Sequence, residues 1–268
     1  MSTFAVTTIH VKTTWAFRLA SGILPYLVSF SALFIAWHLA SIYLVKSILF
    51  PPPIEVFVKA WELLRSGDLE IDMLASLQRI FLGFFLGSAL GIPIGLTIGS
   101  FASVRRLVEP WTEFLRFIPA TALITIAVIW FGIGEEGKVF LIVYTTIFIV
   151  ILNTAAGVAS IHKNMTRAAL ALGATRWQMY TLVALPATVP FILTGMRLAM
   201  ANSFTTIVAA EMISAPHGLG VMLWNGRLFM LVDDIFVSLL TLGLLGFAAD
   251  RLFRMGIYRF AHRYGPVT

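Results

Sequence analysis

Six long apolar stretches constrain the fold of this chain more than any other feature of its sequence. Each has close to the ~20 residues that an α-helix needs to cross the hydrocarbon core of a bilayer. Only 12% of the 268 residues are charged, which is about half the share found in soluble domains. A transmembrane β-barrel would instead alternate apolar and polar residues. We therefore expect an all-α membrane protein whose six transmembrane helices cover 22–45, 79–101, 114–132, 137–160, 190–213 and 231–250.

Lysine and arginine are unevenly distributed among the segments between these helices. If the N-terminus is cytoplasmic, most basic residues lie on or near the cytoplasmic side, where membrane proteins concentrate them. This bias predicts a cytoplasmic N-terminal tail (1–21), a transmembrane domain (22–260) and a cytoplasmic C-terminal tail (261–268). Arg79 is expected at a helix end, and the basic residues expected outside are Lys46, Lys59, Arg65, Lys138 and Arg227.

The loop after the first apolar stretch contains a predicted amphipathic helix. Apolar residues recur there at helical spacing on one face, and Gly67 suits the end of the helix. Such a helix lies on the outer membrane surface, where it either contacts an external partner or anchors the chain in the interface. The sequence leaves both alternatives open. The apolar face consists of Ile54, Phe57, Val58, Trp61 and Leu64.

Glycine recurs every fourth residue through the second apolar stretch. Four residues turn an α-helix by ~400°, so these glycines form one slowly drifting stripe along it. A stripe without side chains lets another helix approach closely, as is common in membrane proteins. We expect a helix-packing face formed by Gly83, Gly87, Gly91, Gly95 and Gly99.

The motifs that enzymes and metal proteins use are missing from the sequence. There is no cysteine, no metal-ligand spacing among the five histidines, and no G-x-x-x-x-G-K-[ST] loop to hold nucleotide phosphates. We therefore expect no catalytic residue, no metal and no cofactor in this chain. The net charge of +6 is attributed to membrane orientation rather than to nucleic-acid binding.

Polar residues inside the apolar stretches are candidates for a translocation path, since each is costly in lipid. In the fifth stretch, Arg197 and Glu211 are 14 residues apart, so they cannot pair along a straight helix. Arg197 is expected to extend to the inner surface. Glu211 either lines the path or bonds to a neighbouring helix, and Thr145 and Thr146 could line the same path. The predicted path residues are Thr121, Thr125, Asn202, Thr205, Thr206 and Glu211.

The stretch RAALALGATRWQMYTLVALP, residues 167–186, reads as a surface helix between two apolar stretches. Paired alanines keep one face of a short helix flat. Gly173 permits a left-handed turn, Thr175 can cap a second helical piece, and Pro186 starts or kinks the next helix. An amphipathic loop on the inner leaflet is the simpler alternative, but leucine and tryptophan are sparse in it.

This stretch resembles the cytoplasmic signature of ABC-type importer permeases, E-A-A-x3-G-x9-I-x-L-P. The alanine pair, Gly173, the final leucine–proline and both spacings match. Arg167 replaces the glutamate and Val183 replaces the isoleucine. The first change reverses a charge, so a salt bridge expected of that glutamate does not carry over.

The wider chain, from about residue 22 to 260, looks like the nitrate/sulfonate/taurine/bicarbonate branch of these permeases. The similar segments are 50–53 (FPPP), 129–135 (IWFGIGE) and 208–213 (VAAEMI). An arginine at the position of Arg167 is also familiar in that branch.

The resemblance implies the fold of type I ABC importers and a location in the bacterial inner membrane. It implies a second copy of the chain, two ATP-binding subunits that hold ATP and Mg²⁺, an extracytoplasmic binding protein, and a small oxyanion as substrate. Residues 162–186 would be the coupling loop, with ATPase coupling through Arg167, Ala168, Ala169, Gly173, Ala174, Thr175, Arg176, Leu185 and Pro186.

Three alternatives stay open at this point. The same machinery could import a neutral or aromatic nutrient such as a vitamin precursor. A stand-alone carrier or channel needs no docking loop, and carriers often contain inverted repeats, of which we find none convincing. A membrane scaffold without transport is compatible with the composition.

Overall fold

The computed structural model describes residues 15–45, 49–212 and 215–260, and every element in these ranges is a helix. The predicted C-terminal tail, residues 1–14 of the predicted N-terminal tail, Lys46 and the last residue of the VAAEMI segment lie outside the described residues. The chain divides into two compact units, Met1–Phe57 and Val58–Thr268, which are described separately.

The first unit is built on α1, Trp15–Leu39, which continues as a π-helix over Ala40–Val45. Residues Leu24–Leu44 are long and apolar enough to cross a membrane. The indole nitrogen of Trp37 donates a hydrogen bond to the carbonyl oxygen of Pro51 at 3.1 Å. The helix begins seven residues before the predicted start at residue 22, so part of the predicted tail is helical.

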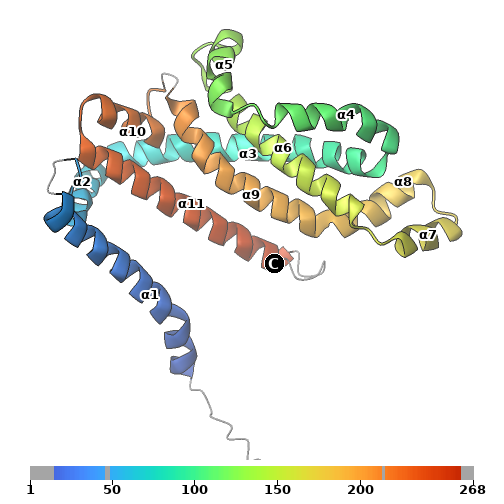
Figure 1. The fold of residues 1–268 in the computed structure, drawn as a ribbon, viewed down its shortest axis with the longest axis horizontal. Coiled ribbons are helices and arrows are strands. Elements are labelled where there is room, and N and C mark those ends of the chain that lie inside the picture. The colour runs from blue at the N-terminus through green and yellow to red at the C-terminus, as the bar shows by residue number, and fades with distance from the viewer. Residues whose placement is uncertain (1–14, 46–48, 213–214, 261–268) are drawn as a thin grey trace, which may run out of the picture. The chain divides into compact units, whose positions relative to one another are not determined.

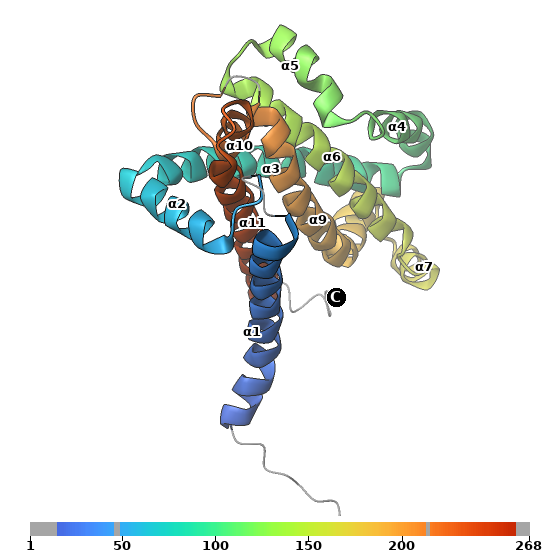
Figure 2. The same cartoon turned by 60° about the vertical axis from the view of Figure 1, so that its left-hand side comes forward.

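Three long helices form the centre of the second unit: α3 (Asp68–Ser100), α6 (Glu135–Ala159) and α9 (Leu185–Glu211). Helix α3 packs along α6, and α6 packs along α9, as Figures 1 and 2 show. Helix α11 (Val232–Phe260) packs against α9 and against the short α10 (Leu219–Leu228). These helices are apolar enough to span a bilayer, except for the shorter α10.

The glycine stripe of α3 faces α6 along its whole length. A Cβ atom added at Gly83 would lie 2.6 Å from Ile142, at Gly87 2.7 Å from Thr146, and at Gly95 2.7 Å from the carbonyl oxygen of Ile151. The corresponding neighbours of Gly91 and Gly99 are also in α6. The two backbones are therefore too close for side chains at these positions.

The predicted single helix over 114–132 is wrong. The chain instead forms α4 (Ala102–Leu115), a 3-10 turn (Ala120–Leu123) and α5 (Ile124–Phe131), and the two helical arms meet at 87°. Pro119 lies at the break with ψ 140°. A proline disfavours helical geometry in the residue before it and offers no backbone donor, so the helix cannot continue. The described residues thus contain five spans, or six if this bent pair is one span.

The second span begins eleven residues earlier than predicted, at Asp68 rather than at residue 79. Helix α2 (Pro53–Ser66) is the amphipathic helix expected from the sequence, and it ends at Gly67, whose φ is +86°. Helix α3 starts directly after that turn. Arg79 consequently lies within α3 and is 6% exposed, which corrects its predicted place at a helix end.

Candidate functional site

The segment 162–186 connects α6 to α9 through two short helices. Helix α7 covers Lys163–Ala171, and α8 covers Arg176–Gln178. A π-helix, Met179–Ala184, then leads into α9, so that 176–211 is one continuous apolar element. Nδ1 of His162 accepts a hydrogen bond from the Asn164 backbone N–H at 3.2 Å and caps the start of α7.

The turn between α7 and α8 has the geometry that the sequence predicts. Gly173 has φ +81°, a conformation that side-chain-bearing residues rarely adopt. The Thr175 hydroxyl accepts from the Gln178 N–H at 3.3 Å, and the Gln178 side chain accepts from the Thr175 N–H at 2.8 Å. This reciprocal cap fixes where α8 starts. Pro186 lies in the first turn of α9, where its missing donor is tolerated.

The predicted coupling residues lie mainly on an exposed surface. Ala169, Ala174 and Pro186 are half-buried, and Leu172, at the tip of the turn, is 89% exposed. An exposed helix with small residues and one apolar tip can receive another protein surface. The exposed members of the predicted set are Arg167, Ala168, Gly173, Thr175, Arg176 and Leu185.

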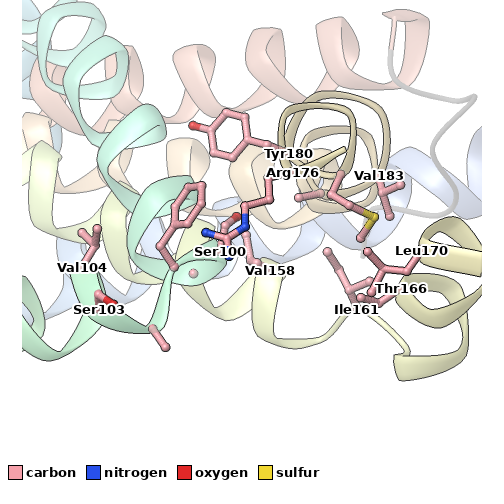
Figure 3. A pocket seen from close by; sticks show the side chains of 15 residues that line it. Ser100, Ser103, Val104, Val158, Ile161, Thr166, Leu170, Arg176, Tyr180 and Val183 are labelled. Carbon is pink, nitrogen blue, oxygen red and sulfur yellow. The ribbon is translucent and has the colours of Figure 1, made fainter. Parts of the chain in front are cut away.

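A groove of about 620 Å³ separates this segment from the ends of α3 and α6. Figure 3 shows the Arg176 side chain extending into it, together with Ser100 of α3 and Val158 of α6. At its edge, the Phe101 and Tyr180 rings stack at 6.2 Å, and the Tyr180 and Trp177 rings at 5.7 Å. The segment therefore touches the elbow between α3 and α4 through aromatic contacts.

A second cavity, of about 340 Å³, lies between the break in the bent pair and the middle of α6 and α9. Asn202, a predicted path residue, lines it. Thr206 does not, but its hydroxyl lies 3.3 Å from the Thr145 hydroxyl, which does. The structure does not bring the other predicted threonines, Thr121, Thr125 and Thr205, into this lining, and all three are exposed.

Glu211 does not line this cavity and bonds to neighbouring elements instead. Its carboxylate accepts from the Ser76 hydroxyl at 2.7 Å, from Arg79 Nη1 at 2.8 Å and from the Gly220 N–H at 2.7 Å. The side chain is fully buried. Of the two roles that the sequence left open, its geometry corresponds to the bond with a neighbouring helix.

Arg79 is the centre of this buried cluster. Its guanidinium forms a two-pronged pair with the Glu135 carboxylate and donates to the His217 carbonyl oxygen at 2.6 Å. The Lys138 ammonium also donates a hydrogen bond to Oε1 of Glu135, at 2.9 Å. Lys138 is only 2% exposed, so it lies inside the bundle rather than in an outer loop.

Sequence reasoning missed this cluster, although one signal was available. Asp68 and Glu70 come just after Gly67, and acidic residues are enriched in the first turn of a helix. That pattern predicts a helix that starts near Asp68. Arg79 then lies three turns inside the helix. The partners of Arg79 could not be read from the sequence, since they lie 56 and 132 residues away.

Arg197 pairs with α11 rather than extending to the membrane surface. Its Nε donates to Asp250 Oδ1 at 2.6 Å and its Nη2 to Oδ2 at 3.2 Å. Asp250 also accepts from Arg254. Among the residues that the structure describes, no group of three or more His, Cys, Asp or Glu is placed to hold a metal ion.

Comparison with known proteins places these features in context. The sequence model of the binding-protein-dependent transport system inner membrane component matches residues 87–260. A taurine transport system permease protein from Escherichia coli is 34% identical, with 86% of this chain and 84% of that protein covered. A nitrate import permease protein from Leptolyngbya laminosa is 31% identical, with 75% of each chain covered.

The fold is also found in solved structures. The crystal structure of a bacterial alginate ABC transporter, in complex with an alginate pentasaccharide-bound periplasmic protein, contains a chain that superposes with a TM-score of 0.58. The two chains are 17% identical, and the match covers 92% of this chain and 98% of the other. The helical arrangement is thus that of type I ABC importer permeases.

Proposed function

Because the chain belongs to the family of binding-protein-dependent transport system inner membrane components, it is a multi-pass permease subunit of an ABC importer, and we propose that it imports a small oxyanion under the control of a separate ATPase. Its relatives carry the names of taurine and nitrate permeases. Taurine bears a sulfonate group besides its ammonium group, so both names refer to compounds with an oxyanion group, and this supports the nitrate, sulfonate or bicarbonate class.

The geometry of segment 162–186 is the observation that supports the proposed coupling to an ATPase. One side of the segment is exposed, with Ala168 and Leu172 at its surface. The opposite side faces the groove formed with the ends of α3 and α6. A subunit docked on the exposed side would therefore push on helices that continue into the membrane.

The assembly that we propose contains two copies of this chain, two ATP-binding subunits and an extracytoplasmic binding protein. ATP and Mg²⁺ bind to the ATPase subunits, whose closure moves segment 162–186. The long helices then alternate between openings to the two sides of the membrane. The alginate transporter crystallised with its periplasmic protein supports the last of these partners.

Ala168→Asp tests the docking surface. Ala168 is exposed in α7, so the change costs the isolated helix under about 1 kcal/mol. Once a partner covers the position, an unpaired carboxylate there is expected to cost about 3 kcal/mol, which weakens the interface roughly a hundredfold. We expect loss of ATPase co-purification and of ATP-driven import in liposomes, while the thermal stability of the permease stays unchanged.

Ala168→Ser is the matched control. It keeps the same exposed position of α7 small and uncharged, so co-purification and import should persist. Full co-purification and coupled import by the Ala168→Asp variant would contradict the docking proposal and favour a stand-alone carrier.

A further inference from the structure

The 340 Å³ cavity lies where the chain is not helical within the bundle. Residues 116–119, between α4 and the 3-10 turn, form one wall, and residues 144–152 of α6 form another. Irregular backbone at membrane depth is tolerated where it lines a cavity or is buried in protein, because its polar groups otherwise lack partners. The volume falls at the lower end of the range of roughly 300–1,000 Å³ typical of small-ligand sites.

The side chains that line the cavity include strong hydrogen-bond donors. Arg116 is the one charged residue among the residues that line the cavity, and a guanidinium offers five N–H donors in a planar fork. Asn202 enters from α9. The Thr206 hydroxyl donates to the Asn202 backbone carbonyl oxygen at 3.0 Å and also lies 3.4 Å from the side-chain oxygen. An amide side chain carries two N–H donors besides its oxygen, so Asn202 adds donors to the lining.

Two contacts hold the donors in place. The Tyr144 hydroxyl donates to the carbonyl oxygen of Leu115, which anchors the end of α4 next to Arg116. The Thr145 and Thr206 hydroxyls lie 3.3 Å apart and link α6 to α9 beside Asn202. The aromatic rings of Phe117 and Phe148 add apolar surface to the lining.

Arg116 already has one acidic neighbour, Glu113, whose carboxylate accepts from Nη2 at 2.6 Å. Both side chains are more than a third exposed, and exposed ion pairs contribute little to stability. An anion in the cavity can therefore replace Glu113 as the partner of the guanidinium at a small cost in free energy. The guanidinium also lies 4.7 Å from the Phe117 ring centre, which restricts how far it can turn.

We propose that this cavity is an oxyanion subsite of the permease, in which Arg116 and the Asn202 amide donate to the oxygens of a sulfonate, nitrate or bicarbonate ion. A trigonal or tetrahedral oxyanion has several acceptor oxygens and fits a guanidinium fork paired with an amide donor. The inference rests on the proposed function, and it assigns the permease itself a part in recognising the substrate.

The test compares Arg116→Gln with Glu113→Gln in liposomes that contain the whole transporter with its binding protein. Nitrate and bicarbonate serve as the anions, taurine serves as a zwitterion that carries a sulfonate group, and an aromatic pyrimidine without an anionic group serves as the neutral probe. We expect Arg116→Gln to lower the anion taken up per ATP hydrolysed by about tenfold or more, as for the loss of one charge-assisted bond. Binding-protein-stimulated ATP hydrolysis should persist in this variant.

Glu113→Gln is the decisive control, since it removes the same ion pair but leaves the cation. Uptake by this variant should equal or exceed that of the parent protein. Equal losses in both variants would show that only the ion pair matters and would overturn the subsite, as would normal uptake by Arg116→Gln.

Asn202→Ala supplies an independent test if Arg116→Gln does not assemble. It should lower anion uptake per ATP, and an unchanged value would overturn the assignment of the amide. A parent protein that imports the pyrimidine and none of the anions would contradict the proposed substrate class, and the subsite with it. A parent protein that imports anions while the cavity variants behave normally would contradict the subsite alone.

Discussion

At the scale of single residues, Arg79 connects more of the molecule than any motif picked out in the sequence. Two of the segments on which the family resemblance rests contain its partners, Glu135 in IWFGIGE and Glu211 in VAAEMI. The Glu211 carboxylate also accepts from the Gly220 N–H. A Cβ added at Gly218 would lie 2.4 Å from that carboxylate. The cluster thus joins the starts of α6 and α10 to the end of α9.

Arg79→Gln is expected to destabilise the permease by roughly 3–5 kcal/mol, because it leaves the buried Glu211 carboxylate without its cation. The melting temperature in detergent is the measurement. Arg106→Gln serves as the control, since Arg106 is exposed on α4, and its melting temperature should match that of the parent protein.

The double variant Arg79→Gln/Glu211→Gln separates charge from packing. If the charge pair is what matters, the double variant should be clearly more stable than the sum of the two single losses implies. Strict additivity would mean that the Arg79–Glu211 pair adds nothing to stability and that Arg79 acts through its other contacts.

At the scale of helices, the pairing of α3 with α6 is the most extensive helix contact in the second unit. Gly95→Ala brings a methyl group to 2.7 Å from the Ile151 carbonyl oxygen, and backbone cannot move aside cheaply. We expect overpacking to lower the free energy of unfolding by roughly 1–3 kcal/mol. The measurements are the melting temperature and the yield of folded protein, both of which should fall.

Gly243→Ala, in α11, is the matched substitution. A Cβ at Gly243 meets nothing within 4 Å, so the gain in helix propensity, up to about 1 kcal/mol, should leave stability equal or slightly higher. If both alanine variants behaved alike, close approach at Gly95 would not be what limits the packing.

The same elements show how far the sequence alone reaches. Length and hydropathy predict the apolar helices, and Gly173 and Thr175 predict the turn and the cap, because these depend on local backbone preferences. The bent pair was missed because residues 114–118, directly before Pro119, are mostly apolar and read as part of the apolar stretch that follows it. The Arg197–Asp250 pair was missed since its members lie 53 residues apart and only packing brings them together.

At the scale of the whole molecule, the basic residues predict which end of the second unit faces the cytoplasm. The chain has no cysteine, so a thiol reagent can label only a cysteine that is introduced by substitution. Leu172→Cys, at the exposed tip of the coupling segment, should react with a membrane-impermeant maleimide only after the cells are opened. Phe229→Cys, 70% exposed after α10, should react in intact cells, and the reverse pattern would invert the proposed orientation.

The separation of the Arg79 partners along the chain imposes an order on biosynthesis. Synthesis proceeds from the N-terminus at roughly 5–20 residues per second, so about 7–26 s separate Arg79 from Glu211, 132 residues later. Glu135 arrives first, 56 residues after Arg79, and allows α3 and α6 to form an early pair. Until Glu211 leaves the ribosome, Arg79 of α3 therefore lacks this carboxylate partner. During that time the insertion machinery or neighbouring helices must shield the Arg79 side chain from lipid.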